Sequence, residues 1–145
     1  MICSLSSSSS RALSSLSFSS RIMSKIQVSA KMKIPEGMLE EFKVQVTECI
    51  RQVKEKDHGT LQYDWFLSCD NSECEIREAY ESSDAALLHQ SNLREQLRIL
   101  FEKFGSVQSV VIYGDPSPEL LENVNSSGIE TVIFSFLKGL NHINE

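Results

Sequence analysis

Residues 59–80 read GTLQYDWFLSCDNSECEIREAY and contain two alternating segments on either side of a short polar turn. Apolar side chains recur at every second position of the first segment, which predicts a strand: Leu61, Tyr63, Trp65 and Leu67. Residues 75–80 form the second strand, and residues 70–73, Asp-Asn-Ser-Glu, are of the types that favour turns. The stretch therefore predicts an antiparallel β-hairpin.

The segment before this hairpin predicts a strand and then a helix. Residues 26–34 alternate between apolar and polar side chains. Apolar residues then recur at steps of three and four, which places them on one helical face: Leu39, Phe42, Val46, Cys49, Ile50 and Val53. Lys54 and Lys56 suit the negative end of the helix dipole, and His58-Gly59 closes the helix.

The segment after the hairpin predicts a helical region, a strand, a short helix and a last strand. Ser82 or Ser83 can cap the helical region, whose first face carries Ala85, Leu88, His89 and Asn92. An apolar stripe follows and stops at Gly105: Leu93, Leu97, Leu100, Phe101 and Phe104. The later elements are a strand over residues 107–113, a helix over 119–124 and a strand over 130–137.

The order β-α-β-β-α-β with an additional C-terminal strand predicts an α+β, ferredoxin-like fold. One sheet face carries the helices, and the other would face solvent. Both faces nevertheless carry apolar side chains, since Phe66 points away from Tyr63 and Trp65 and the strand over residues 107–113 is apolar on both sides. A patch of this kind is normally covered by a partner, so we expect a homodimer formed sheet to sheet.

Length and charge exclude several classes of protein. A chain of 145 residues makes one ordinary domain. Its net charge of −6 argues against a nucleic-acid partner, which requires clustered Lys and Arg. Because no apolar run approaches the roughly 20 residues that span a bilayer, no membrane segment is expected.

The first 24 residues differ in composition from the rest. Half of them are Ser, two are Arg, and no acidic residue occurs before Glu36. This composition is typical of a transit peptide, which would direct the protein to a mitochondrion or plastid. There are two alternatives. The segment could be a disordered tail, or the start codon could be set too early, with Met23 as the true start. In either case the protein would be cytoplasmic. We assign residues 1–24 to a leader, 25–140 to the domain and 141–145 to a tail.

The cysteines do not form a disulfide framework. Cys3, Cys49, Cys69 and Cys74 are too few and too scattered for one. Cys69 and Cys74 flank the hairpin turn and could be cross-linked, although two reduced thiols are the simpler interpretation. Because only two thiols lie together, a zinc site is not supported.

Three motifs give the chain a family resemblance. They are Gly59-Thr60-Leu61-Gln62-Tyr63, then Glu78-Ala79-Tyr80 at a strand end, then Ala85-Ala86-Leu87-Leu88-His89 on the following helix. The segment from Tyr113 to Leu120 adds to the likeness. Together they resemble the antibiotic-biosynthesis-monooxygenase (ABM) family, the quinol-monooxygenase-like proteins, over roughly residues 25–140.

The resemblance implies a dimeric α/β barrel with one pocket per subunit between helices and sheet. Members oxidise quinols or polycyclic aromatic compounds with dioxygen and without metal or flavin, degrade haem, or isomerise small carbonyl compounds. Haem degradation fits poorly. The haem-degrading members have an Asn on the first strand and a helical Trp, whereas here Gln27 is the only amide on the first strand and Trp65 lies on the second.

In the family's helix the histidine faces the sheet, which makes His89 the first candidate for catalysis. Imidazole titrates near neutral pH and can take a proton from a phenol or an enol. The alternative is a core histidine bonded to Glu78 or to a backbone carbonyl. Glu78 could orient His89 as a second catalytic residue, or it could be an exposed carboxylate paired with Arg77 or a neighbouring strand.

Four further residues are candidates for substrate binding. Tyr63, Trp65 and Tyr80 can stack on an aromatic substrate, or they can belong to the core. Asn92 can bind a substrate carbonyl, or it can lie in solvent beside a helix break. We interpret His58 as a cation near a helix end and not as a ligand. No Gly-rich phosphate loop occurs, so nucleotide cofactors have no support, and no Ser or Cys lies in a nucleophile-elbow context. The family resemblance implies chemistry without any cofactor.

These observations lead to three hypotheses of function. The first is a cofactor-independent monooxygenase that uses dioxygen on quinol-like or other electron-rich small molecules, with His89 as base. The second is an isomerase of a small carbonyl metabolite, which would use the same histidine. The third is a non-catalytic dimeric module that binds a small molecule.

Overall fold

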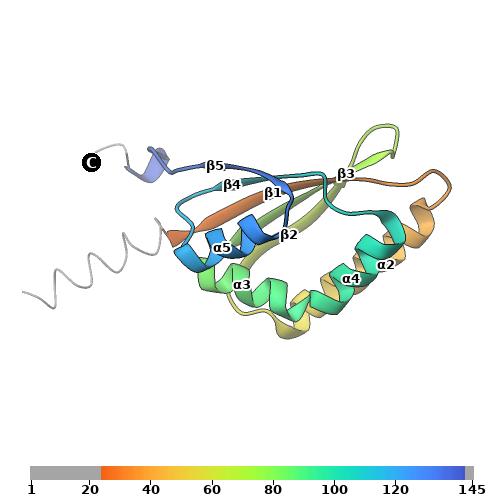
Figure 1. Ribbon diagram of the computed structural model, residues 1–145, viewed down its shortest axis with the longest axis horizontal. Coiled ribbons are helices and arrows are strands. Elements are labelled where there is room, and N and C mark those ends of the chain that lie inside the picture. Colours follow the sequence, from red (N-terminus) through yellow and green to blue (C-terminus); the bar gives the residue numbers. More distant parts are fainter. Residues whose placement is uncertain (1–23, 143–145) are drawn as a thin grey trace, which may run out of the picture.

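A computed structural model describes residues 24–142, which form one five-stranded sheet with helices on one face (Figure 1). The strands are β1 (Ile26–Lys33), β2 (Thr60–Leu67), β3 (Glu73–Tyr80), β4 (Ser109–Tyr113) and β5 (Glu130–Phe134). The helices are α2 (Leu39–Lys56), α3 (Ser83–Asn92), α4 (Arg94–Phe104) and α5 (Pro118–Ser126), with a 3₁₀ turn at Leu140–His142. The predicted leader lies almost entirely outside the described residues.

The sheet has the strand order β2-β3-β1-β4-β5 and confirms the ferredoxin-like prediction. The β2–β3 hairpin pairs Tyr63 with Glu78 and Trp65 with Ile76. Its turn contains Asn71 at φ 59°, a left-handed conformation that Asn tolerates. β5 pairs parallel to β4 after the α5 crossover, so the additional C-terminal strand extends the sheet at one edge. The sheet of one chain is open and does not close into a barrel.

Two strands are shorter than predicted because the pairing ends earlier than the apolar pattern. Val107 is buried in the core, but the pairing with β1 begins only at Gln108, whose N–H donates to the carbonyl of Lys31. β5 stops at Phe134, where β4 also ends. There the N–H of Gly114 donates to the carbonyl of Phe134. Gly114 has a φ of 130°, and a Cβ at this residue would lie 2.7 Å from the carbonyl oxygen of Lys25, so only glycine fits here.

The helical region after the hairpin consists of two helices that meet at a fully buried Leu93. Ser82 is the N-cap of α3, since its Oγ accepts from the N–H of Ala85 at 3.1 Å. The prediction that Ala85, Leu88, His89 and Asn92 form the inward face of α3 is only partly correct. Ala85 and His89 are buried, whereas Leu88 is 38% exposed and Ala86 is buried in its place.

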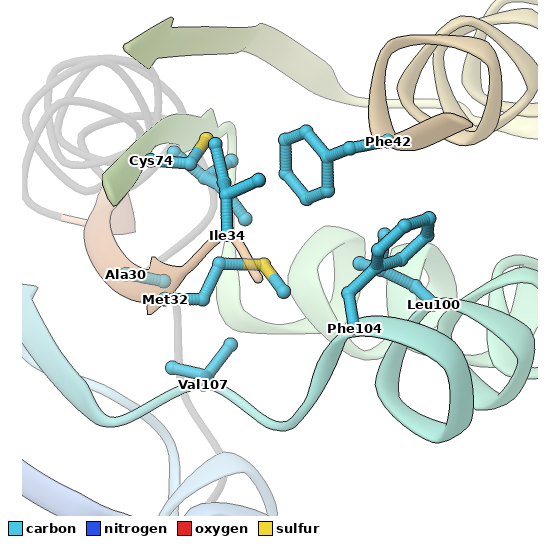
Figure 2. Packing of buried hydrophobic residues seen from close by; sticks show 9 residues of the cluster. Ala30, Met32, Ile34, Phe42, Cys74, Leu100, Phe104 and Val107 are labelled. Atoms are coloured by element: carbon cyan, nitrogen blue, oxygen red, sulfur yellow. The ribbon is translucent and has the colours of Figure 1, made fainter. Parts of the chain in front are cut away.

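The core lies between the sheet and the helices in two clusters of buried side chains. Figure 2 shows the larger cluster, in which Met32 of β1 packs toward Phe42 of α2 and Phe104 of α4. The smaller cluster joins Ile26, Tyr80 and Ile112 of the sheet to α3 and α5. Side chains from both clusters also line the cavity described below.

The face of the sheet without helices carries exposed apolar side chains. Phe66 and Phe134 are 52% and 56% exposed, and Tyr113 stacks on Phe134 with ring centroids 5.8 Å apart. Cys49, Cys69 and Cys74 are free thiols in the structure. Within residues 24–142, no helix combines the length and apolar character needed to cross a membrane.

Candidate active site

A cavity of about 660 Å³ lies between the sheet and helices α3, α4 and α5. Its sheet wall is mostly apolar, with Val28, Ala30, Ile76, Val110 and Ile112. Exposed Arg94 and Arg98 of α4 also line it, so the cavity reaches the surface. Its volume and its largely apolar wall are typical of a site for a small organic molecule.

His89 projects from α3 into the wall of this cavity and is 3% exposed. Its Nδ1 lies 2.6 Å from Oδ2 of Asp57, the residue at the C-terminal cap of α2. The Asp57 carboxylate also accepts from Oγ1 of Thr60 at 2.8 Å and from Nδ2 of Asn92 at 2.9 Å. Because Nδ1 is engaged by the carboxylate, Nε2 is the ring nitrogen available to a ligand.

The turn between α2 and β2 brings Asp57 against α3. Gly59 in this turn has φ +88°, and a Cβ there would lie 2.9 Å from Cβ of Ala85. Glycine therefore lets the turn approach α3 closely. Asn92, one turn after His89, fixes the contact from the other side by donating also to the carbonyl of Lys56 at 3.0 Å.

Asp57 is held as a carboxylate. Burial opposes its ionisation, but the hydrogen bonds from Asn92, His89 and Thr60 outweigh burial and keep the pKa of Asp57 below its usual value. A carboxylate bonded to Nδ1 selects the tautomer with its proton on Nδ1 and stabilises an imidazolium if Nε2 takes a proton. The Asp57–His89 pair can therefore act as a base directed at the cavity.

Glu78 of β3 lies in the same cavity wall, but the structure places Asp57 and not Glu78 against Nδ1 of His89. Glu78 instead accepts from the hydroxyl of Tyr80, which is 2.8 Å from Oε2. Burial raises the pKa of Glu78, although the charge of His89 and the Tyr80 hydrogen bond act in the opposite direction. The suggested pairing of Glu78 with Arg77 is wrong. Arg77 lies on the other face, 3.6 Å from a carboxylate oxygen of Glu75.

The aromatic candidates divide into two groups. The rings of Tyr63 and Tyr80 line the cavity and contact His89, with centroid distances of 4.8 Å and 5.2 Å. Burial raises the pKa of both phenols well above the usual value. Trp65 is not among the lining residues. It packs edge to face on Phe42 at 6.0 Å, and its Nε1 is buried without a hydrogen-bond partner among the described residues.

Sequence reasoning missed Asp57 and Thr60, and it assigned Asn92 a different contact. Asn92 holds Asp57 and does not line the cavity. The available signal was an Asp at the end of a helical pattern, directly before His58-Gly59. Such a residue is ordinarily a solvent-exposed helix end, so the signal was weak. His58 is exposed and has no role in the described site.

The helical wall of the cavity carries two arginines that differ in their partners. Arg98 forms ion pairs with Glu95 at 2.6 Å and Glu102 at 2.7 Å. Arg94 has no ion pair with any residue that the structure describes.

Between residues 24 and 142, no group of three or more His, Cys, Asp or Glu side chains is arranged to hold a metal ion.

Comparison with known proteins connects this geometry to solved structures. No protein-family model and no curated protein matches the chain. MupZ from Pseudomonas fluorescens superposes with a TM-score of 0.66 at 20% identity, over 80% of this chain and 93% of that protein. A conserved protein from Methanosarcina mazei Go1 has a TM-score of 0.58 at 18% identity, over 67% and 98% of the two chains.

Other similar structures are provisionally described as antibiotic biosynthesis monooxygenases. The one from Nitrosomonas europaea has a TM-score of 0.54 at 19% identity, over 66% of this chain and 93% of that chain. Proteins from Caulobacter crescentus and Chloroflexus aurantiacus carry the same description. At these identities the likeness establishes the fold, and the chain therefore shares the ferredoxin-like α+β fold of proteins described as antibiotic biosynthesis monooxygenases.

Proposed function

We propose that the protein is a cofactor-independent monooxygenase that acts on quinol-like or other electron-rich, enolisable small molecules. The observation that carries this proposal is the Asp57–His89 pair, a buried imidazole oriented by a carboxylate at 2.6 Å and opening onto a largely apolar cavity. The shared fold with proteins described as monooxygenases supports it by analogy.

His89 is the base of the proposed reaction. Its Nε2 removes a proton from a phenol or from a carbon beside a conjugated carbonyl, and Asp57 stabilises the resulting imidazolium. The substrate anion then reduces dioxygen, and a carbon–oxygen bond forms to give a peroxide. The imidazolium returns its proton to the peroxide. When the oxygenated carbon still carries a hydrogen, as in a former CH₂ group or at a ring C–H of a quinol, loss of water leaves a carbonyl, so one oxygen atom ends in the product and the other in water.

The apolar wall supports the proposed chemistry in two ways. It excludes water, which would otherwise solvate the anion and lower its reactivity toward dioxygen. The rings of Tyr63 and Tyr80 also offer flat surfaces beside the base, on which a planar substrate can stack. The oxidised carbon would then lie close to Nε2 of His89.

Oxygen uptake with a panel of naphthoquinols and anthrones tests the proposal. His89→Asn is the sharpest variant, because its amide N–H can still donate to Asp57 while the base is lost. His58→Ala is the matched control, since it removes the neighbouring exposed histidine. We expect His89→Asn to lose at least about 100-fold in turnover and His58→Ala to keep full turnover.

Two results would contradict the proposal. Substrate-dependent isomerisation in the absence of oxygen would favour an isomerase that uses the same base. Tight binding of aromatic ligands with no uptake across the panel would favour a non-catalytic binding module. We also propose that the protein forms a homodimer that covers the outer sheet face. Neither of these results bears on the dimer, which gel filtration tests separately.

A further inference from the structure

We propose that Glu78, as a carboxylic acid, donates a hydrogen bond to a carbonyl oxygen of the substrate, while His89 takes a proton elsewhere on the same molecule. The substrate class would then be a conjugated molecule with both a hydroxyl, or an acidic C–H, and a carbonyl. This inference rests on the proposed role of His89 as base, but it assigns Glu78 a function of its own.

The position of Glu78 indicates a group directed at a ligand. Its side chain lies in the cavity wall on the helix-covered face of β3. The Tyr80 hydroxyl occupies Oε2 at 2.8 Å, which leaves Oε1 as the oxygen that can carry a proton and donate it. No Lys or Arg of residues 24–142 forms an ion pair with Glu78.

A half-buried carboxyl in the wall of a largely apolar cavity, without a cationic partner, favours its neutral form. Burial is the largest influence on Glu78 and raises its pKa, and the negative charge of Asp57 acts in the same direction. Other titratable groups line the same cavity from β2, β3, α3 and α4: Tyr63, Tyr80, His89, Arg94 and Arg98. Both arginines lie on the exposed helical wall, and Arg98 is neutralised by Glu95 and Glu102.

The base and the acid share the same two aromatic neighbours. Tyr63 is the cross-strand partner of Glu78, and its ring lies 4.8 Å from that of His89. Tyr80 donates to Glu78, and its ring lies 5.2 Å from that of His89. A planar molecule beside these rings can therefore meet both groups.

This arrangement suits the charge that develops during proton removal. When His89 takes the proton, the negative charge spreads through the conjugated system onto the carbonyl oxygen. A donor already placed at that oxygen stabilises the anion without reorganisation. Two titratable groups whose environments favour opposite roles are a frequent arrangement for acid–base chemistry.

Binding of the three hydroxyacetophenone isomers, compared with the matching ethylphenols, tests the inference under anaerobic conditions. Each pair has the same phenol and similar size, but only the ketone offers a carbonyl. We expect at least one isomer to bind about tenfold more tightly than its ethylphenol. Glu78→Gln should keep most of this preference through its amide N–H, and Glu78→Ala should abolish it.

The control variant is Glu73→Gln, which changes an exposed carboxylate at the start of the same strand. Infrared difference spectroscopy gives a second readout, because wild-type protein at neutral pH should show a protonated-carboxyl stretch that Glu78→Gln lacks. A carbonyl preference that survives in Glu78→Ala, or the absence of that stretch, would overturn the inference. Neither readout requires turnover, so an absence of oxygen uptake would count against the proposed function and not against the role of Glu78.

Discussion

Replacing Asp57 with Ala should destabilise the fold as well as impair the site. The Asp57 side chain is 2% exposed and accepts hydrogen bonds from His89, Thr60 and Asn92. Its removal leaves the buried Nδ1–H of His89 without a partner, while Asn92 keeps its bond to the carbonyl of Lys56. Breaking one side of a buried pair of this kind costs about 3–5 kcal/mol.

Thermal unfolding should register this loss directly. For a domain of this size, each kcal/mol corresponds to about 3–5 °C in Tm, so a loss of about 3–5 kcal/mol should lower the Tm of Asp57→Ala by about 9–25 °C. Asp64→Asn is the matched control, because Asp64 is an exposed carboxylate of β2 whose bonded partner is Gln62 at 2.9 Å. A change of less than about 3 °C for Asp57→Ala would refute the reasoning.

The effect of Asp57 should also depend on pH in a known direction. Its pKa is lowered in the folded state, so the ionised carboxylate stabilises the fold above the unfolded pKa of about 4. This stabilisation is lost as the pH falls through the folded pKa. The difference in stability between wild type and Asp57→Ala should therefore be full at neutral pH and shrink below about pH 4.

Asp57→Asn separates orientation from charge. The amide oxygen can still accept from Nδ1 of His89 and from Oγ1 of Thr60, which share one carboxylate oxygen of Asp57. The amide cannot stabilise an imidazolium, however, and its N–H₂ group faces the donor Nδ2 of Asn92. We expect a smaller loss of about 1–3 kcal/mol in stability. Turnover in the folded fraction should fall by at least about 100-fold. Full turnover in Asp57→Asn would show that the carboxylate does not assist the base.

Three further predictions concern the surfaces and termini. Phe134→Glu places a charge on the exposed outer sheet face and should convert the expected dimer to monomer on gel filtration with little change in Tm; an unchanged elution volume would contradict a sheet-to-sheet dimer. A chain lacking residues 1–23 should melt within about 2 °C of the full chain, since this Ser-rich segment has the composition of a leader and not of a core element. Alkylation of this shortened chain at pH 8 should label exposed Cys69 and spare Cys49 and Cys74, because burial raises the pKa of each of these two thiols to about 11. Mass spectrometry after brief labelling checks the outcome, and rapid labelling of all three thiols would contradict it.

The sequence alone determined the order of the elements, because that order depends on neighbours along the chain. The alternation of apolar and polar side chains over residues 61–67 and the turn at Asp70 predicted the β2–β3 hairpin. Apolar residues that recur every three or four positions from Leu39 predicted α2. Helix and strand periods differ, so each segment could be identified without its partners. The ends of β4 and β5 were predicted less well, since a strand ends where its neighbour stops pairing and not where its apolar pattern stops.

Only the tertiary structure decided which side chains meet at the site. His89 could be chosen from the sequence, but its partner lies 32 residues away at the end of another helix, where local pattern carries no signal of contact. The close packing at Gly59 brings Asp57 to His89 and leaves Glu78 to face the cavity with Tyr80. The same packing places Trp65 against Phe42, outside the cavity. Distances between segments remote in sequence depend on how helices and sheet pack, and therefore no single stretch of the chain encodes them.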